Sequence, residues 1–208
     1  MFRHAAALAL ALLALPAQAQ NLETALVAGG CFWCVESDFR RVEGVTDVRV
    51  GFAGGSTPNP SYDDVVRGRT EHLEVAQITF DADQISYAQI LHTFLRSVDV
   101  LDDGGQFCDR GAHYTTAIFA TPEQDATARA AIAEAEAELG QPIVTPVRAD
   151  APFYEADDFH QNYANSTERT LTRFGWVERR VAYRQYREGC GRDARVQELW
   201  GDAAPFVN

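Results

Sequence analysis

The alternation of apolar and polar positions in the first half of the chain predicts three strands and one helix. A short apolar run at residues 24–28 ends at a Gly-Gly pair, which is typical of a buried strand. Apolar side chains then recur at helical spacing over residues 31–42, so we expect an amphipathic helix that begins at a cysteine. Residues 45–52 and 73–80 have the patterns of two further strands, separated by a turn-rich loop.

The second half of the chain continues with two helices and two strands. Ser86, with a glutamine three residues later, forms a capping box that opens a helix reaching about Ser97. We expect a strand at residues 114–120, a long Ala- and Glu-rich helix over residues 121–140 and a last short strand at residues 144–148. The first six elements have the order βαββαβ. We therefore predict an α+β fold, a ferredoxin-like two-layer α/β plait with an antiparallel or mixed sheet and additional helices.

Composition favours one catalytic domain followed by an arm. The chain has 208 residues and is 46% hydrophobic, which is enough to bury one sizeable core. We assign residues 20–165 to the catalytic domain. Residues 166–208 are polar and arginine-rich, so we expect a C-terminal arm with short helices that wraps around the domain. The formal net charge of −12 argues against binding to a phosphate backbone. We expect a monomer without a nucleic-acid partner.

The first residues of the chain, 1–19, have the pattern of a secretory signal peptide. Arg3 precedes an apolar run at residues 5–15, and Ala17-Gln18-Ala19 is an A-x-A cleavage site. A transmembrane anchor is the alternative, but this run is too short to span about 30 Å of hydrocarbon. We therefore expect export to the periplasm without membrane insertion after cleavage, in an oxidising compartment where disulfides persist.

The chemically informative residues are concentrated around Cys31. A cysteine in the first turn of a helix lies near exposed N–H groups and the positive end of the helix dipole. Both favour the thiolate, so the pKa of Cys31 is expected to lie below the usual value of about 8.5. The alternatives are a small buried side chain or half of a structural disulfide. The order strand, Gly-Gly, cysteine, helix favours a nucleophile.

The run GCFWCVE at residues 30–36 resembles the signature of the A-class peptide methionine sulfoxide reductases. The resemblance continues in order through Gly54-Gly55, Pro58-Asn59-Pro60-Ser61-Tyr62, His72-Leu73-Glu74, Asp109, Gly111, Tyr114, Thr121-Pro122-Glu123-Gln124, Phe153-Tyr154 and His160-Gln161-Asn162-Tyr163. It implies a thiol-dependent reductase for the S epimer of methionine sulfoxide, free or in proteins. It also implies no cofactor other than an external reductant, such as a thioredoxin-like protein.

The resemblance implies a role for each matching residue. Cys31 would attack the sulfoxide sulfur, which yields methionine and a sulfenic acid. Glu74 would protonate the departing oxygen, because sulfoxide oxygen is a poor leaving group until it is protonated. Tyr62 and Tyr114 would donate hydrogen bonds to that oxygen, and Asp109 would organise the site.

Phe32 and Trp33 would form the apolar slot for the substrate's methyl group.

Three features depart from the family pattern. Cys108 stands where the family commonly has Asn, and Ala112-His113 stands where it often has Thr-Gln. The chain also lacks a Gly-rich tail after residues 189–192. The departures bear on recycling of the oxidised enzyme and leave the first half-reaction intact.

Three cysteines are candidates for resolving the sulfenic acid, which happens when a second thiol condenses with it to a disulfide. Cys190 lies between glycines on the arm, and family members often resolve from that region, so we favour it. Cys34 is the alternative, although one helical turn from Cys31 is far for Cβ atoms that must approach to about 3.8 Å. Cys108 is the third candidate.

Two other classes of protein fit parts of the sequence. Cys31 and Cys34 have the CxxC spacing of a thiol–disulfide oxidoreductase, but the ordered match elsewhere has no place in that class. A metal-binding module would use cysteines with His72, His113 or His160. Only one CxxC pair exists, so we expect no metal site.

Overall fold

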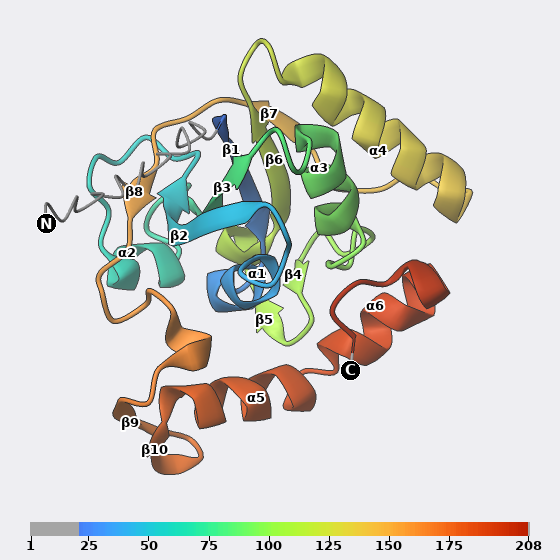
Figure 1. Cartoon of the computed structure of the whole chain (residues 1–208). Coiled ribbons are helices and arrows are strands. Elements are labelled where there is room, and N and C mark those ends of the chain that lie inside the picture. The colour runs from blue at the N-terminus through green and yellow to red at the C-terminus, as the bar shows by residue number, and fades with distance from the viewer. Residues whose placement is uncertain (1–20, 208) are drawn as a thin grey trace, which may run out of the picture.

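The computed structural model describes residues 21–207, in which a six-stranded sheet is followed by an arm (Figure 1). The predicted signal peptide at residues 1–19 lies outside the described residues. The sheet has the order β7-β6-β1-β3-β2-β8, and only β6 and β7 pair in parallel. Its strands are β1 (Leu22–Gly29), β2 (Val45–Ala53), β3 (Leu73–Asp81), β6 (Thr116–Ala120), β7 (Val147–Ala149) and β8 (Tyr154–Glu155).

Helices and two hairpins surround this sheet. The helices are α1 (Phe32–Phe39), α2 (Tyr62–Val66), α3 (Tyr87–Leu95), α4 (Asp125–Leu139), α5 (Arg179–Gly189) and α6 (Arg192–Trp200). The hairpins are β4 (Gly105–Gln106) with β5 (Asp109–Arg110), and β9 (Arg169–Thr172) with β10 (Gly175–Glu178). The elements β1-α1-β2-β3-α3-β6, with neighbours β6-β1-β3-β2, form the predicted ferredoxin-like plait, so the fold class is confirmed.

Apolar side chains cover both faces of the sheet. Successive residues of a strand point to opposite faces. Ala25 and Val27 therefore pack with α1, α3 and α4, whereas Leu26 and Ala28 pack on the other face against Phe153 and its neighbours. Burial on both faces explains why this strand is a continuous apolar run rather than an alternating one.

Several predicted boundaries differ from the structure, among them α4, which begins at Asp125 rather than Thr121, and the three that follow. Helix α1 begins at Phe32, because Cys31 has non-helical backbone angles (φ −52°, ψ 115°) and is the N-cap. Strand β7 begins at Val147 rather than three residues earlier, because Pro146 has no N–H to donate to the ladder with β6. Tyr114 lies in a 3₁₀ turn (Ala112–Tyr114) before β6 rather than in the strand.

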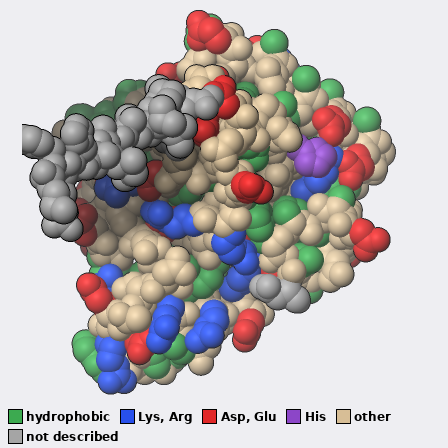
Figure 2. All heavy atoms as spheres, in the orientation of Figure 1, with side chains coloured by type: hydrophobic (Ala, Val, Ile, Leu, Met, Phe, Trp, Pro, Cys, Tyr) green, Lys and Arg blue, Asp and Glu red, His purple; other side chains and the backbone are tan. Residues whose placement is uncertain are grey.

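The arm runs from the β9–β10 hairpin through α5 below α1 and ends with α6 (Figure 1). Val196 and Trp200 of α6 are buried in the helix-side core, and Arg195 pairs with Asp99 at 2.7 Å. Basic side chains gather over the arm on the face drawn in Figure 2. No helix within residues 21–207 is long and apolar enough to cross a membrane.

Candidate active site

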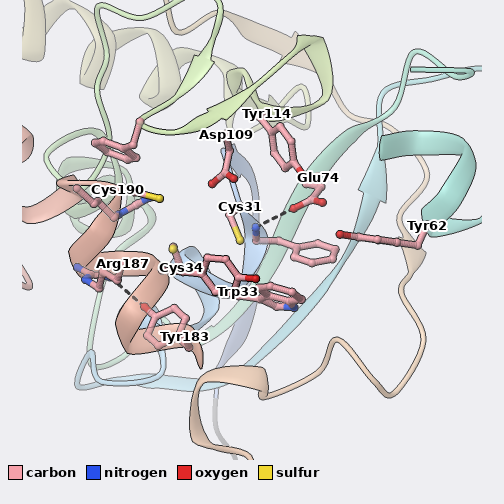
Figure 3. A pocket seen from close by; sticks show the side chains of 14 residues that line it. Cys31, Trp33, Cys34, Tyr62, Glu74, Asp109, Tyr114, Tyr183, Arg187 and Cys190 are labelled. Atoms are coloured by element: carbon pink, nitrogen blue, oxygen red, sulfur yellow. Dashed lines mark hydrogen bonds between the residues drawn. The ribbon is translucent and has the colours of Figure 1, made fainter. Parts of the chain in front are cut away.

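A cavity of about 230 Å³ lies where the start of α1, strand β3, the β4–β5 hairpin and the arm meet (Figure 3). Nine residues that the sequence singled out line it: Cys31, Phe32, Trp33, Cys34, Tyr62, Glu74, Asp109, Tyr114 and Cys190. Five residues to which sequence reasoning gave no role complete the wall: Phe107, Tyr183, Tyr186, Arg187 and Arg192. The cavity therefore brings together side chains from distant parts of the chain.

Close packing of the Gly30 backbone against the side chain of Gln106 positions Cys31. Gly30 has φ +78°, and a Cβ atom there would lie 2.4 Å from Cβ of Gln106. Only glycine fits this turn without strain. Gln106 is buried, and its amide both donates to Asp99 O (2.8 Å) and accepts from Asp99 N–H (2.9 Å). The β4–β5 hairpin is thereby held against the end of β1, where the chain turns into α1.

Glu74 is a buried acid beside the start of α1. It extends from β3, is 1% exposed, and its Oε2 accepts a hydrogen bond from the N–H of Phe32 at 3.0 Å. Burial raises the pKa of Glu74 to about 8, against the opposing effect of that hydrogen bond. The side chain is therefore mainly neutral at pH 7 and holds a proton that it can donate into the cavity.

Two phenols and a second carboxyl group surround Glu74 and Cys31. Ser61 caps α2 by accepting from the N–H of Asp64, which fixes Tyr62 at the first position of that helix. Burial and the nearby Glu74 raise the pKa values of Tyr62 and Tyr114, so both remain hydrogen-bond donors at neutral pH. Burial also raises the pKa of Asp109, which lies above Cys31 in Figure 3.

Cys31 and Cys34 are free and form a hydrogen-bonded pair. The hydrogen bond to Cys34 and burial raise the pKa of Cys31, and the neighbouring carboxyl groups act in the same direction. The hydrogen bond from Cys31 lowers the pKa of Cys34, and Arg192 and Arg187 add to this. The expectation of a lowered pKa at Cys31 is wrong, because the hydrogen bond to Cys34 and burial outweigh the helix N-terminus.

An aromatic stack supports the side of the cavity that Phe32, Trp33 and Tyr62 line. The Trp33 ring lies on Tyr163 with centroids 3.8 Å apart, and Tyr62 lies on His160 at 4.2 Å. Burial lowers the pKa of His160 to about 4, so this ring is neutral. The motif that contains His160 and Tyr163 is visible in the sequence, but no local pattern predicts that they support the apolar slot.

The other two cysteines are joined to each other. Cys108, in the turn of the β4–β5 hairpin, forms a disulfide with Cys190, with Cα atoms 5.1 Å apart. Cys190 is half-buried in the cavity wall, whereas Cys108 is exposed and outside the cavity lining. Figure 3 shows Cys190 on the side of the cavity opposite Tyr62, with Cys31 and Cys34 between them.

The histidines considered as metal ligands have other contacts. Both ring nitrogens of His72 are used, one accepting from Gly55 N–H (3.1 Å) and the other contacting Thr57 O (2.7 Å). His160 belongs to the aromatic stack, and His113 packs on Tyr114. No group of three His, Cys, Asp or Glu side chains in residues 21–207 is arranged to hold a metal ion.

Comparison with known proteins gives consistent matches. The family model described as "Peptide methionine sulfoxide reductase" matches residues 23–190. The chain is 47% identical over 193 residues to "Peptide methionine sulfoxide reductase MsrA 2" of Rhizobium meliloti (strain 1021), covering 92% of this chain and 90% of that one. A protein of the same name from Caulobacter vibrioides is 40% identical over 184 residues, with 88% of each chain covered. Among solved structures, methionine sulfoxide reductase A of Corynebacterium diphtheriae is similar with a TM-score of 0.66 and 29% identity, covering 76% of this chain and 84% of that one.

Proposed function

The chain belongs to the peptide methionine sulfoxide reductase family, and from this we propose that it reduces the S epimer of methionine sulfoxide, free or in proteins, to methionine. It is a thiol-dependent oxidoreductase whose role is the repair of oxidised methionine. The observation that carries the proposal is the neutral, buried Glu74 beside the Cys31 thiol in a cavity with an apolar side.

In the first half-reaction Cys31 is the nucleophile and Glu74 the acid. In the state in which Cys34 is the thiolate, Cys31 passes its proton to it across their hydrogen bond. Cys31 then attacks the sulfoxide sulfur and forms a sulfur–sulfur bond with it. Glu74 protonates the departing oxygen. The protonated oxygen moves from the substrate sulfur to Cys31 as the sulfur–sulfur bond breaks. Cys31 is then a sulfenic acid, the substrate leaves as methionine, and Glu74 is left as a carboxylate. Sulfur of the substrate is reduced by two electrons, and sulfur of Cys31 is oxidised by two.

The remaining cavity residues support binding. Tyr62 and Tyr114, which stay protonated, donate hydrogen bonds to the sulfoxide oxygen, and Asp109 orients the groups around Cys31. Phe32 and Trp33 hold the methyl group. The stack of Trp33 on Tyr163 supports this role, because it fixes the indole in one orientation.

In the second half-reaction Cys190 condenses with the sulfenic acid, which releases water and forms a Cys31–Cys190 disulfide. Cys190 lines the same cavity as Cys31, which supports its assignment over a cysteine outside the cavity lining. Cys34 stays the alternative, since Cys31 is an N-cap and the CxxC pair is in contact. A thioredoxin-like protein then reduces the disulfide.

We also propose that the protein is exported to the periplasm and works there as a monomer. The leader at residues 1–19 supports export. Because cytosolic thioredoxin is absent from that compartment, the reductant would be a thioredoxin-like donor supplied with electrons through the membrane.

The deciding experiment compares the two epimers of the substrate. The purified mature chain is assayed with dithiothreitol on separated S and R epimers of methionine sulfoxide, with Cys31→Ser as the matched control. We expect turnover of the S epimer alone, and none in the variant. Turnover of the R epimer alone, or reduction of insulin disulfides without any action on sulfoxides, would refute the proposal.

A further inference from the structure

We propose that Cys108 is a second recycling cysteine, which takes the disulfide over from Cys31 and presents it to the external reductant. This inference rests on the proposed function and extends it beyond Cys190. It gives a chemical role to a residue that departs from the family pattern at the position before Asp109.

The four cysteines form two pairs that differ in redox state and location. Cys31 and Cys34 are free thiols inside the cavity, whereas Cys108 and Cys190 form a disulfide at its edge. Cys190 belongs to both regions, because it lines the cavity and is bonded to the exposed Cys108. It is therefore the one cysteine of the described chain that can exchange with either side.

Two arginines, one on each side of Cys190, hold the arm in place. Before it, Arg187 of α5 contacts Asp38 of α1 at 2.9 Å, and the Asp38 side chain is 1% exposed. After it, Arg192 of α6 donates to Ser97 O at 2.8 Å, and its guanidinium lies 4.7 Å from the ring centre of Phe107. These contacts keep Cys190 between α1, which follows Cys31, and the hairpin turn that carries Cys108.

The backbone at Cys190 allows its sulfur to reach two partners. Gly189 and Gly191 flank it, and Gly191 has φ +66°, a conformation that glycine adopts without strain. A Cβ atom at either glycine would meet nothing within 4 Å, so there is open space around both. A junction of this kind permits a local rotation while α5 and α6 remain anchored.

The exchange balances without any further reactant. In the Cys31–Cys190 disulfide formed during turnover, the Cys108 thiolate attacks the sulfur of Cys190. A Cys108–Cys190 bond forms, the Cys31–Cys190 bond breaks, and Cys31 leaves as a thiolate. No electrons are gained or lost overall. Cys31 is then free to reduce a second sulfoxide before any reductant arrives.

Cys108 and Cys190 differ in exposure, and this difference decides which of them the reductant attacks. A thioredoxin-like donor must bring its own thiolate in line with a disulfide sulfur, which requires access. Cys108 is exposed, whereas Cys190 is half-buried in the cavity wall. The donor should therefore bond to Cys108 and release Cys190.

The alternative is a structural disulfide that takes no part in turnover. In that case fully reduced enzyme would make one methionine per chain, since Cys31 would be blocked after one reaction. With the relay, it makes about two, because the first oxidising equivalent moves to Cys108–Cys190. The count of methionine per chain separates the two possibilities regardless of rate.

The test is a burst experiment on fully reduced protein, with four thiols per chain verified by titration and with excess S sulfoxide but no reductant. We expect about two methionines per chain for the wild type and about one for Cys108→Ser. Cys34→Ser is judged by its count of methionines alone, because Cys34 takes part in the first step and its loss should slow that step; about two are expected, and one would route the transfer through Cys34 and overturn the direct path from Cys31 to Cys190.

One methionine from the wild type, or two from Cys108→Ser, overturns the role of Cys108. No methionine from any form refutes the proposed function instead. A second measurement uses a thioredoxin-like donor whose second active-site cysteine is replaced by serine. Mass spectrometry should find it bonded to Cys108, and a bond to Cys190 would contradict the assigned site of attack.

Discussion

Replacing Glu74 by glutamine should make the protein slower and, above acidic pH, more stable. The substitution Glu74→Gln retains an oxygen that can accept the hydrogen bond from Phe32 N–H but removes the transferable proton. General acid catalysis is typically worth about 10²- to 10⁴-fold, so sulfenic acid formation should slow by at least about a hundredfold. In the wild type the single-turnover rate should also fall as the pH rises through about 8, where Glu74 loses its proton, and this fall should be absent in the variant.

The stability effect follows from the same shift in pKa. Folding raises the pKa of Glu74 from 4.5 to about 8, so between these values the folded state binds more protons than the unfolded state. The wild type therefore loses stability as the pH rises through this window, and loses none of it below the window. At about 1.4 kcal/mol per pH unit, the accumulated loss is about 3 kcal/mol at pH 7 and about 5 kcal/mol well above pH 8. Glutamine does not titrate and escapes this loss.

The assay is urea unfolding of wild type and Glu74→Gln at pH 5 and pH 9. We expect the difference in unfolding free energy between them to grow by about 4 kcal/mol in favour of the variant. Glu23→Gln, at an exposed position of β1, is the control, and its difference from wild type should stay within about 0.5 kcal/mol at both pH values. An equal difference for Glu74→Gln at the two pH values would mean that Glu74 is ionised at neutral pH and is not the acid.

Three further substitutions test the chemistry and the turn that supports it. Cys31→Ser should abolish reduction, because a hydroxyl is a far weaker nucleophile at neutral pH; measurable turnover of sulfoxide would refute the assignment of Cys31 as the nucleophile. Cys190→Ser should still reduce one equivalent of sulfoxide per chain but stall with a thioredoxin-like donor, while dithiothreitol restores part of the activity; full activity with the protein donor would move the resolving role to Cys34. Gly30→Ala should lower the free energy of unfolding by at least about 1 kcal/mol, because its Cβ would overlap Gln106 in a left-handed turn. Urea unfolding measures this change, and an unchanged midpoint would contradict the packing argument.

Most of the fold could be predicted because its signals are local. The apolar periods that predicted β1, β2, β3 and α3 reflect which side chains face the two cores. The capping box at Ser86 is present as predicted, with both of its hydrogen bonds formed. Gly140 ends α4 with φ +68°, the conformation for which glycine is common at that place. The errors are at boundaries, where one residue such as Pro146 decides which N–H groups can join a ladder.

The candidate site was predictable only where a short run of sequence carries the signal. GCFWC identifies Cys31 and its neighbours, and the ordered match supplies Glu74, Tyr62, Asp109 and Tyr114. The pairing of Cys108 with Cys190 has no local signal, because 82 residues separate them and only the docking of the arm on the hairpin brings them together.

The direction of the pKa shift at Cys31 is the property that sequence reasoning predicted wrongly, and the reason is tertiary. A helix N-terminus favours a thiolate by roughly the interaction of one charge with the last few backbone dipoles, an effect that falls off within one turn. At Cys31 the hydrogen bond to Cys34 and burial oppose it, and at Cys34 two arginines of the arm help to lower the pKa. These arginines lie more than 150 residues further along the chain, so no window around GCFWC contains them. Because Arg187 and Arg192 also hold the arm beside Cys190, the same two arginines that lower the pKa of Cys34 position the proposed resolving cysteine. The arm is therefore part of the reactive centre rather than an appendage to the catalytic domain.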